Sequence, residues 1–312
     1  MANGVLITPG NIADLSPDSY AVHPFDALTD SVSNLAGTVI ANTDLSDRAA
    51  LSVSYTESGR DAVAVVAEGQ EIVESETKLK NVTVPSVKLA VLKTASNEIL
   101  SHSNTAADTG TRISEQALQD LRDAADTAIF RTGSGATDTG LTPLATTAGI
   151  TDLEFGENLD WLSDALANIV DGGGRESDTV IVASPAAQAA LLKLKDATNG
   201  NRPLVDTLSG TSQFAVPNAT GMGPMTVPVR NLAGVPILVS RNLSDPAGGV
   251  PDLYVIDRPN LLIAATEATM AISKDAEFSR DATAFRGTLR LGWKLARPER
   301  VSRITITAPE TP

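Results

Sequence analysis

The stretch VVAEGQEIVESETKLKNVTV carries four clustered carboxylates, and these are the first candidates for chemistry in the sequence: Glu68, Glu71, Glu74 and Glu76. Converging carboxylates can bind a metal ion, and two carboxylates in different environments can divide an acid–base reaction between them. In an extended strand, however, Glu71 would point away from the other three, and no histidine or aspartate adjoins them. Lys78 and Lys80 continue the parity of those three, which indicates charge pairing on a face turned to solvent or to a partner. We therefore expect no metal, no cofactor and no catalytic residue here.

The composition excludes several classes of function. The chain has 312 residues, of which 42% are hydrophobic and 20% are charged, as in folded globular proteins. Cysteine is absent and histidine occurs twice, at His23 and His102, so disulfides, thiol nucleophiles and cysteine-based zinc sites are excluded and histidine-dependent triads nearly so. The formal net charge of −14 argues against a protein that mainly grips nucleic-acid phosphates. No apolar run reaches the ~18–20 residues that cross a bilayer and no signal peptide is visible, so we expect no membrane contact and a site of action in the cytoplasm or in an assembly made there.

Two further motifs have both a catalytic and a structural interpretation. The sequence VASPA places Ser184 at a strand-to-helix turn, where a hydrolase nucleophile could lie. It lacks the G-x-S-x-G spacing of a nucleophile elbow, whereas Ser184 followed by Pro185 is typical of a helix N-cap and first turn. The glycine triplet 172–174 before Arg175 could suggest a phosphate loop, but it follows a helix-like segment and lacks the lysine of a P-loop. The structural interpretation is favoured for both motifs.

The first third of the chain alternates between irregular and β-like patterns. Residues 1–50 show little periodicity and indicate an extended arm with short apolar anchors, which would need neighbours to lie on. From Leu51 to Leu92, apolar and polar residues alternate, and the apolar parity changes from even to odd at Pro85-Ser86. A β-bulge at that position would restore the pattern. We predict two long strands that run out and back, joined through the glutamate segment.

Helical and strand patterns then follow one another. Apolar residues recur at a spacing of three to four from Ile113 to Ile129, which predicts a helix that ends before Gly133. A second helix is predicted over 159–169, with Asn158 as its cap and the glycine triplet as its end. A buried strand precedes Ser184, and two more strands are expected at 234–240 and 252–257.

The chain returns to strands from Leu261 onward, so that the overall class is α+β. Five of the arginines in this last part follow one another at short intervals, and they are Arg286, Arg290, Arg297, Arg300 and Arg303. They could form a basic strip that faces nucleic acid or an acidic segment of a neighbouring subunit. The acidity of the whole chain favours the neighbour.

The order of these segments resembles the major capsid proteins of tailed bacteriophages, the HK97 fold that encapsulins share. The resemblance covers roughly residues 50–308 and rests on VAEGQEIVES, VKLAVLKTASNEILSHS, the long helix, FRTGSGATDTGLTPL, SPAAQAALLKLKDATNGNRPL, AGVPILVS and the strand-rich end. It implies an N-terminal arm (1–50), an extended β-hairpin loop (51–83), a peripheral domain with a long spine helix (84–139), an α/β apical domain (140–260) and returning peripheral strands with the C-terminus (261–312).

The resemblance implies a structural subunit rather than an enzyme. Such subunits assemble into hexamers and pentamers of an icosahedral shell, in which the extended loop lies on the adjacent subunit. The candidates for contacts between subunits are Glu68, Glu71, Glu74, Glu76, Arg60, Arg202, Arg286 and Arg290. Further implied partners are a portal protein, separate scaffolding and decoration proteins, and packaged DNA held non-specifically. The location would be the virion capsid, assembled in the host cytoplasm.

Three alternatives remain at this point. An encapsulin-type compartment would share the fold, although the long arm is unlike shells that open with a helix. A cytoplasmic α/β hydrolase would need Ser184 to be a nucleophile. A tail or adhesin protein would predict repeats or a coiled coil, and neither is seen. Some relatives carry a cleaved N-terminal scaffold segment, but the fold begins soon after Met1, so scaffolding is expected from a separate protein.

The sequence makes a prediction about covalent cross-linking. Some relatives join their subunits by a lysine–asparagine isopeptide bond that needs a lysine on the extended loop, and no lysine precedes Lys78 at the base of the loop. We therefore expect a single band of one subunit mass on a denaturing gel of assembled particles. A ladder of covalent oligomers would contradict this prediction.

Overall fold

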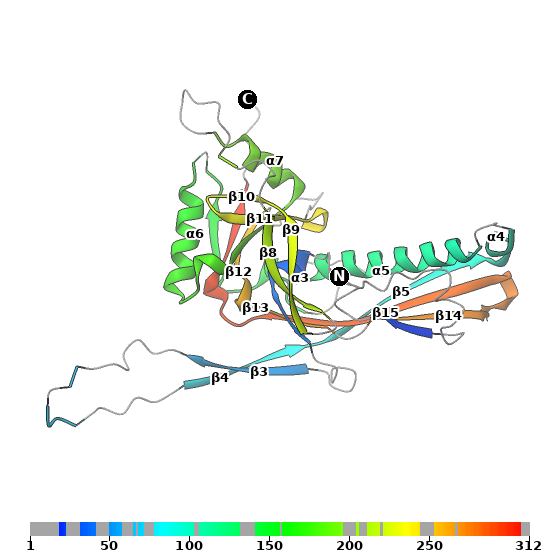
Figure 1. Ribbon diagram of the computed structural model, residues 1–312, viewed down its shortest axis with the longest axis horizontal. Coiled ribbons are helices and arrows are strands. Elements are labelled where there is room, and N and C mark those ends of the chain that lie inside the picture. Colours follow the sequence, from blue (N-terminus) through cyan, green and yellow to red (C-terminus); the bar gives the residue numbers. More distant parts are fainter. Residues whose placement is uncertain are drawn as a thin grey trace.

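The computed structural model shows an α+β subunit whose described part contains two six-stranded sheets and two separate β-hairpins (Figure 1). The structure describes residues 19–22, 32–41, 50–57, 65–66, 68–71, 78–102, 106–131, 141–156, 158–195, 204–205, 211–218, 221–243, 253–265 and 268–306. The α+β class predicted from the sequence is confirmed.

The first sheet is organised around its longest strand, β15. Its strands are β1 (Ser19–Val22), β2 (Thr38–Ala41), β5 (Val87–Ser96), β13 (Leu261–Ala265), β14 (Ala268–Glu277) and β15 (Ala282–Leu295). Strand β15 pairs with β5 along one edge and with β13 and β14, one after the other, along its other edge. β1 then extends the sheet beyond β14, and β2 extends it beyond β13.

Helix α5 (Ala106–Phe130) lies along one face of this sheet (Figure 1). Its apolar residues recur every three or four positions, so Leu121, Ala125 and Ile129 are all buried against the sheet. The helix comes close to the strands at Gly287 of β15, where an added Cβ would lie 3.1 Å from Cδ1 of Leu121. The predicted helix is thus confirmed, and it begins slightly earlier than its apolar pattern indicated.

The second sheet carries a helical layer on each face. Its strands, in spatial order, are β10 (Arg230–Leu232), β11 (Val235–Val239), β7 (Thr179–Ala183), β12 (Leu253–Asp257), β16 (Val301–Thr305) and β6 (Thr151–Glu154). Helices α6 (Asp160–Asp171) and α7 (Pro185–Lys193) bury their apolar sides in one core with residues such as Ile181 and Val255. The opposite face shares a core with α3 (Val32–Ala36) and the end of α5, where the Tyr254 hydroxyl donates to the Phe130 carbonyl at 2.8 Å.

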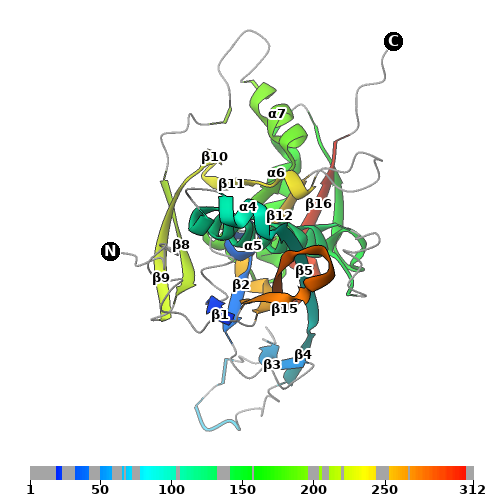
Figure 2. The same cartoon turned by 90° about the vertical axis from the view of Figure 1, so that its right-hand side faces the viewer.

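Two hairpins stand outside the sheets. Strands β3 (Ala50–Glu57) and β4 (Lys78–Pro85) form the hairpin that projects furthest from the body (Figure 1). Strands β8 (Thr211–Asn218) and β9 (Gly221–Pro228) form the other, on the side of the molecule away from β16 (Figure 2). The base of the β3–β4 hairpin is anchored because Val82 and Val84 pack against Leu262 and Ala264 of β13.

Short helices complete the described part. They are α4 (Asn97–His102) and the 3₁₀ turns η4 (Leu144–Thr146), η5 (Glu176–Asp178), η6 (Arg241–Leu243), η7 (Arg258–Asn260), η8 (Phe278–Arg280) and η9 (Pro298–Arg300). None of the described helices combines the length and apolar character that a membrane span requires.

Several local predictions are confirmed. Ser184 is the N-cap of α7, where its hydroxyl accepts from the Ala187 amide at 3.1 Å and Pro185 is the first helical residue. Helix α6 ends at the glycine triplet, and Gly173 has a φ of 83°. The predicted cap of α6 is wrong, because the N-cap is Leu159 and the Asn158 amide instead donates to the Asp160 carboxylate.

Other segments lie differently from the sequence-based expectation. No bulge joins β4 to β5: β4 pairs with β3, β5 pairs with β15, and the parity changes because the chain passes from the hairpin to the first sheet. Within the range expected to be an arm, residues 32–41 form α3 and β2, since Leu35 and Ala36 fill the core. Strand β16, from the range expected to be peripheral, pairs with β12 and β6 in the second sheet.

The crossing between the hairpin and the first sheet generates a stability prediction. A Cβ on Gly292 of β15 would lie 2.0 Å from the Pro85 carbonyl oxygen, a backbone atom that cannot move aside alone. We expect Gly292→Ala to lower the free energy of unfolding by about 1–3 kcal/mol or more. Gly110→Ala in α5 is the control, because a Cβ there has no neighbour within 4 Å and should stabilise by about 0.5–1 kcal/mol. Urea unfolding followed by circular dichroism measures both, and equal stabilities would refute the close crossing.

Candidate functional site

The tip of the β3–β4 hairpin carries two of the predicted contact residues. Glu68 and Glu71 are both exposed, and the described segment 68–71 lies at the far end of the hairpin (Figure 1). The expectation of a strand with shared parity is wrong for residues 68–71, because the chain turns there and Gly69 has a φ of 82°, which favours glycine. Glu74, Glu76, Arg60 and Arg202 lie outside the described residues.

Apolar side chains accompany the two carboxylates. Val65 is fully exposed and Val66 is 37% exposed, close in sequence to Glu68. Within the described residues no group of carboxylates, histidines or cysteines could hold a metal ion. The tip therefore presents apolar and acidic groups together, a combination suited to a surface that is apolar and basic.

A surface of that kind lies on the face of the first sheet opposite α5. Gly287 points toward α5, so its neighbours Arg286 and Thr288 point to the other face, where the Thr288 hydroxyl lies 2.7 Å from that of Thr269. In the register of β5 and β15, Arg286 is opposite Leu92 and Arg290 is opposite Lys88. We call the outward side chains of β5, β15 and β14 the outer sheet face.

The charged side chains near the centre of the outer sheet face are all positive. Arg286 and Lys88 are exposed and Arg290 is half-buried, while Leu92 beside them is 63% exposed. Like charges directly opposite each other, as at Lys88 and Arg290, destabilise an isolated sheet. Sequence reasoning found Arg286 and Arg290 but missed Lys88 and Leu92, which only the strand register brings beside them.

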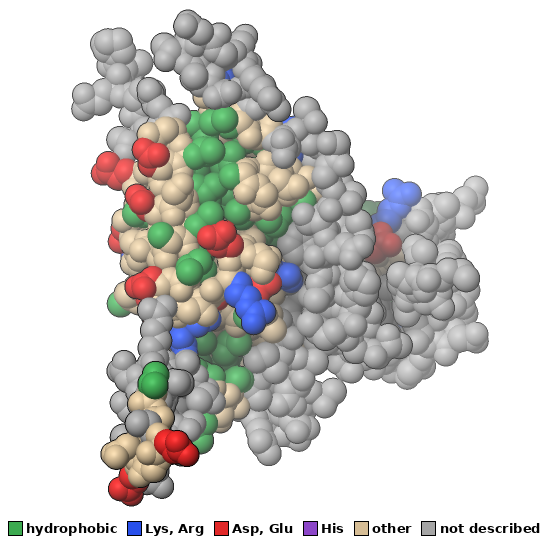
Figure 3. All heavy atoms as spheres, turned by 60° about the vertical axis from the view of Figure 1, so that its left-hand side comes forward, with side chains coloured by type: hydrophobic (Ala, Val, Ile, Leu, Met, Phe, Trp, Pro, Cys, Tyr) green, Lys and Arg blue, Asp and Glu red, His purple; other side chains and the backbone are tan. Residues whose placement is uncertain are grey.

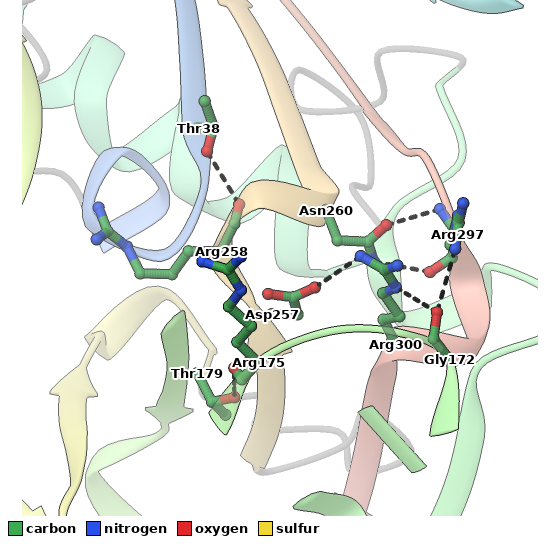
Figure 4. Close-up of polar contacts among 9 residues, drawn as sticks. All are labelled: Thr38, Gly172, Arg175, Thr179, Asp257, Arg258, Asn260, Arg297 and Arg300. Carbon is green, nitrogen blue, oxygen red and sulfur yellow. Dashed lines mark hydrogen bonds and ion pairs between the residues drawn. The ribbon is translucent and has the colours of Figure 1, made fainter. Parts of the chain in front are cut away.

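The remaining arginines of the expected basic strip turn inward. Arg300 donates to the Gly172 carbonyl at 2.8 Å and pairs with the Asp257 carboxylate at 3.2 Å (Figure 4). Arg297 also donates to Gly172, at 3.2 Å, so two guanidinium groups meet the carboxyl end of α6. Such cations are favourable at that end of the helix dipole. Arg303 forms a bidentate pair with Asp152 at 2.6 and 2.9 Å.

Charged side chains, partly or fully buried, connect the two sheets, and we call the cluster formed by Asp257, Arg258, Arg297 and Arg300 the seam. Burial raises the pKa of Asp257 above its ordinary value of 3.8, while attraction to Arg300 and a hydrogen bond from it oppose that rise and the nearby Asp178 adds to it. Burial likewise lowers the pKa of Arg258, whose Nε donates to the Leu35 carbonyl at 2.7 Å. The carbonyl of Arg258 accepts from the Thr38 hydroxyl at 3.2 Å, which connects the seam to β2 (Figure 4).

Arg297 also connects the seam to the base of the hairpin. Its guanidinium lies 5.4 Å from the ring centroid of Tyr55 in β3, within cation–π range. The Tyr55 hydroxyl donates to the Ala296 carbonyl at 3.2 Å. Asn260 holds the backbone of the same arginine by accepting from its amide at 2.6 Å and donating to its carbonyl at 2.7 Å. The side chain of Arg297 thus interacts with both the end of α6 and the base of the hairpin.

The solved structures most informative for this arrangement come from phages and a related particle. The capsid of a native GTA particle is similar to the chain at 17% identity, covering 90% of this chain and 91% of that one, with a TM-score of 0.60. A structure from Gordonia phage Cozz matches at 19% identity over 93% and 88%, with a TM-score of 0.62. One from Mycobacterium phage Adephagia matches at 15% identity over 98% and 99%, with a TM-score of 0.63. No curated protein sequence matches significantly.

At these identities the similarity establishes a shared fold. The projecting hairpin, the long helix on the first sheet and the α/β second sheet define an HK97-like fold. The chain belongs to the phage capsid family, whose sequence profile matches residues 36–306. It is a structural subunit of a capsid shell, and the resemblance inferred from the sequence is confirmed. The encapsulin and hydrolase alternatives are not favoured.

The seam yields a prediction with a defined pH dependence. Arg300→Ala would leave the Asp257 carboxylate buried without its partner, which costs about 3–5 kcal/mol of unfolding free energy near neutral pH. A raised pKa means that the folded chain binds the proton of Asp257 more tightly than the unfolded chain does. This tighter proton binding adds to the free energy of unfolding at low pH, and that contribution is lost as pH rises through the raised pKa of Asp257. We expect the loss caused by Arg300→Ala to shrink as pH falls toward the ordinary range of aspartate.

Denaturant unfolding of the purified chain at several pH values measures this loss. Arg280→Ala is the matched control, because the pair between Arg280 and Glu277 is largely exposed and its removal should cost less than about 1 kcal/mol. A loss for Arg300→Ala that equals the control, or that does not vary with pH, would contradict the role assigned to the seam.

Proposed function

We propose that the chain forms rings of five and six subunits that build an icosahedral phage head around double-stranded DNA. The observation that carries this proposal is the β3–β4 hairpin, anchored at its base and exposed at an apolar and acidic tip. A projection of this kind buries its tip only against another chain. Rings close when each subunit offers its neighbour a surface that differs from the one it receives.

The tip of one subunit lies on the outer sheet face of its neighbour. Val65 and Val66 would cover the exposed Leu92, while Glu68 and Glu71 would face Arg286 and the pair formed by Lys88 and Arg290. This contact would place acidic groups beside cationic ones and would remove exposed apolar surface at both ends. Glu74, Glu76, Arg60 and Arg202 stay predicted contact residues of the same kind.

Further partners follow from a shell that encloses a genome. A portal protein would occupy one vertex, a separate scaffolding protein would guide assembly in the host cytoplasm, and a decoration protein could bind the outer surface. Contact with DNA would be non-specific and weak, because the net charge of −14 disfavours binding to phosphates.

A charge-reversal experiment tests the contact between tip and outer sheet face. We expect Glu68→Lys with Glu71→Lys to raise the protein concentration needed for assembly about five-fold or more, since two exposed pairs contribute about 1 kcal/mol per contact. Adding Arg286→Glu and Lys88→Glu in the same chain should restore assembly in part. Glu115→Lys, an exposed glutamate on α5, is the control for the charge change. Light scattering and negative-stain electron microscopy report the shells.

The outcomes separate the two levels of the proposal. Shells formed by the Glu68→Lys and Glu71→Lys variant at the same concentration as the unmodified chain would refute the residue contact and leave the shell intact. An unmodified chain that stays a monomer at all concentrations, with and without a scaffolding protein, would refute the ring-forming function itself.

A further inference from the structure

The outer layer of the second sheet presents two helices with complementary surfaces. Helices α6 and α7 cover the same face of the sheet, because their buried residues share one core. Their opposite sides are open to solvent in the single chain. Each of these open sides has a regular pattern of side chains.

The open side of α6 is acidic and apolar. Asp160, Asp164 and Asp171 are exposed and recur at helical spacing with Ala167, which places them in one row. Beside that row lies an apolar flank, in which Val170 is 43% exposed and Leu166 is half-buried. Figure 3 shows this side of the molecule, with a column of hydrophobic side chains and acidic side chains along its outer edge.

The acidic row is unfavourable within the single chain. Asp160 lies in the first turn, where the helix dipole favours it, but it repels Asp164 four residues further on, and Asp171 ends the helix at the negative pole of the dipole. Helix α6 contains no lysine or arginine, and among the described residues no ion pair involves Asp164 or Asp171. A sequence that keeps this row against local preference is consistent with a cationic partner.

The open side of α7 is basic and apolar. Pro185, Ala189 and Leu192 are exposed and recur at helical spacing, and Leu192 is 37% exposed. Lys193 flanks this row and the exposed Lys195 follows just beyond the helix. The helix itself contains no acidic residue. Its apolar row and flanking cation thus complement the apolar flank and acidic row of α6 in chemical character.

The two helices lie toward different ends of the sheet. Helix α6 packs over β6, β16 and β12, whereas α7 packs on β7, nearer to β11 and β10 (Figure 1). A surface at one end that fits a surface at the other end produces a head-to-tail contact between copies, which closes into rings. We propose that α6 of one subunit docks against α7 of the adjacent copy in the ring, an inference that rests on the proposed ring assembly.

The absence of cysteine allows a direct test. Two single variants, Val170→Cys and Leu192→Cys, are co-assembled and then oxidised, so that a disulfide between the two kinds of subunit can form only between chains. We expect the mixed 170–192 disulfide to be the main product, identified by mass spectrometry of the peptides from the dimer band of a non-reducing denaturing gel. Ile99→Cys, another exposed apolar position, mixed with Leu192→Cys is the control and should give at least ten-fold less dimer.

Charge reversal tests the same contact without cysteine chemistry. Asp164→Lys and Lys193→Glu should each raise the concentration needed for assembly several-fold, and a chain that carries both changes should recover. Asp275→Lys, at an exposed position in β14, controls for the change in net charge. Circular dichroism confirms that each variant is folded.

Each outcome decides between distinct conclusions. Particles that form while the 170–192 dimer stays at the control level would overturn the docking of α6 on α7 and leave the shell function standing. Predominant 170–170 dimers would overturn it in favour of a two-fold contact between α6 helices. Protection of the thiol of the Val170→Cys variant only when a decoration protein is added would assign the acidic row to that protein and overturn the proposal. Failure of the unmodified chain to form any particle would refute the ring assembly on which it rests.

Discussion

Close packing on both faces of β15, against side chains at Gly287 and against backbone at Gly292, is the constraint on which the rest of the chain depends. On one face, the missing side chain of Gly287 leaves room for Leu121 of α5. On the other face, the missing side chain of Gly292 lets the backbone of Pro85 pass close to the strand. Because neither position has room for a side chain, the long helix, the first sheet and the base of the hairpin have fixed relative positions. The outer sheet face and the base of the hairpin are therefore held on one frame, so that little ordering of these parts would be needed in the proposed contact between subunits.

The seam between the two sheets solves a different problem. Several carbonyls at the carboxyl end of α6 lack partners within the helix, and Arg297 and Arg300 satisfy the carbonyl of Gly172. Asp257 compensates the second of these charges in a buried position. The hydrogen bonds of this cluster are directional, so it fixes the angle between the sheets more sharply than apolar packing alone would.

Local patterns in the sequence identified most elements because their causes are local. The spacing of apolar residues in α5 and the Ser184-Pro185 pair act within one or two turns of a helix. Which strands pair is decided by distant partners: Val84 and Leu89 have similar surroundings in sequence, yet they belong to a hairpin and to the first sheet. The inward role of Arg300 depends on Asp257 and Gly172, and the place of Lys88 beside Arg290 depends on register. Neither the inward role of Arg300 nor the position of Lys88 could be predicted from the alternation of polar and apolar residues in the sequence.

Arg297 has a mechanical consequence. The same guanidinium meets the end of α6 and the ring of Tyr55 at the hairpin base. A displacement of α6 would therefore act on the base of the hairpin through Arg297, and a small rotation there would become a larger movement at the tip. In the ring proposed above, that tip would rest on the next copy, so that strain applied to one subunit would be passed to its neighbours around the ring.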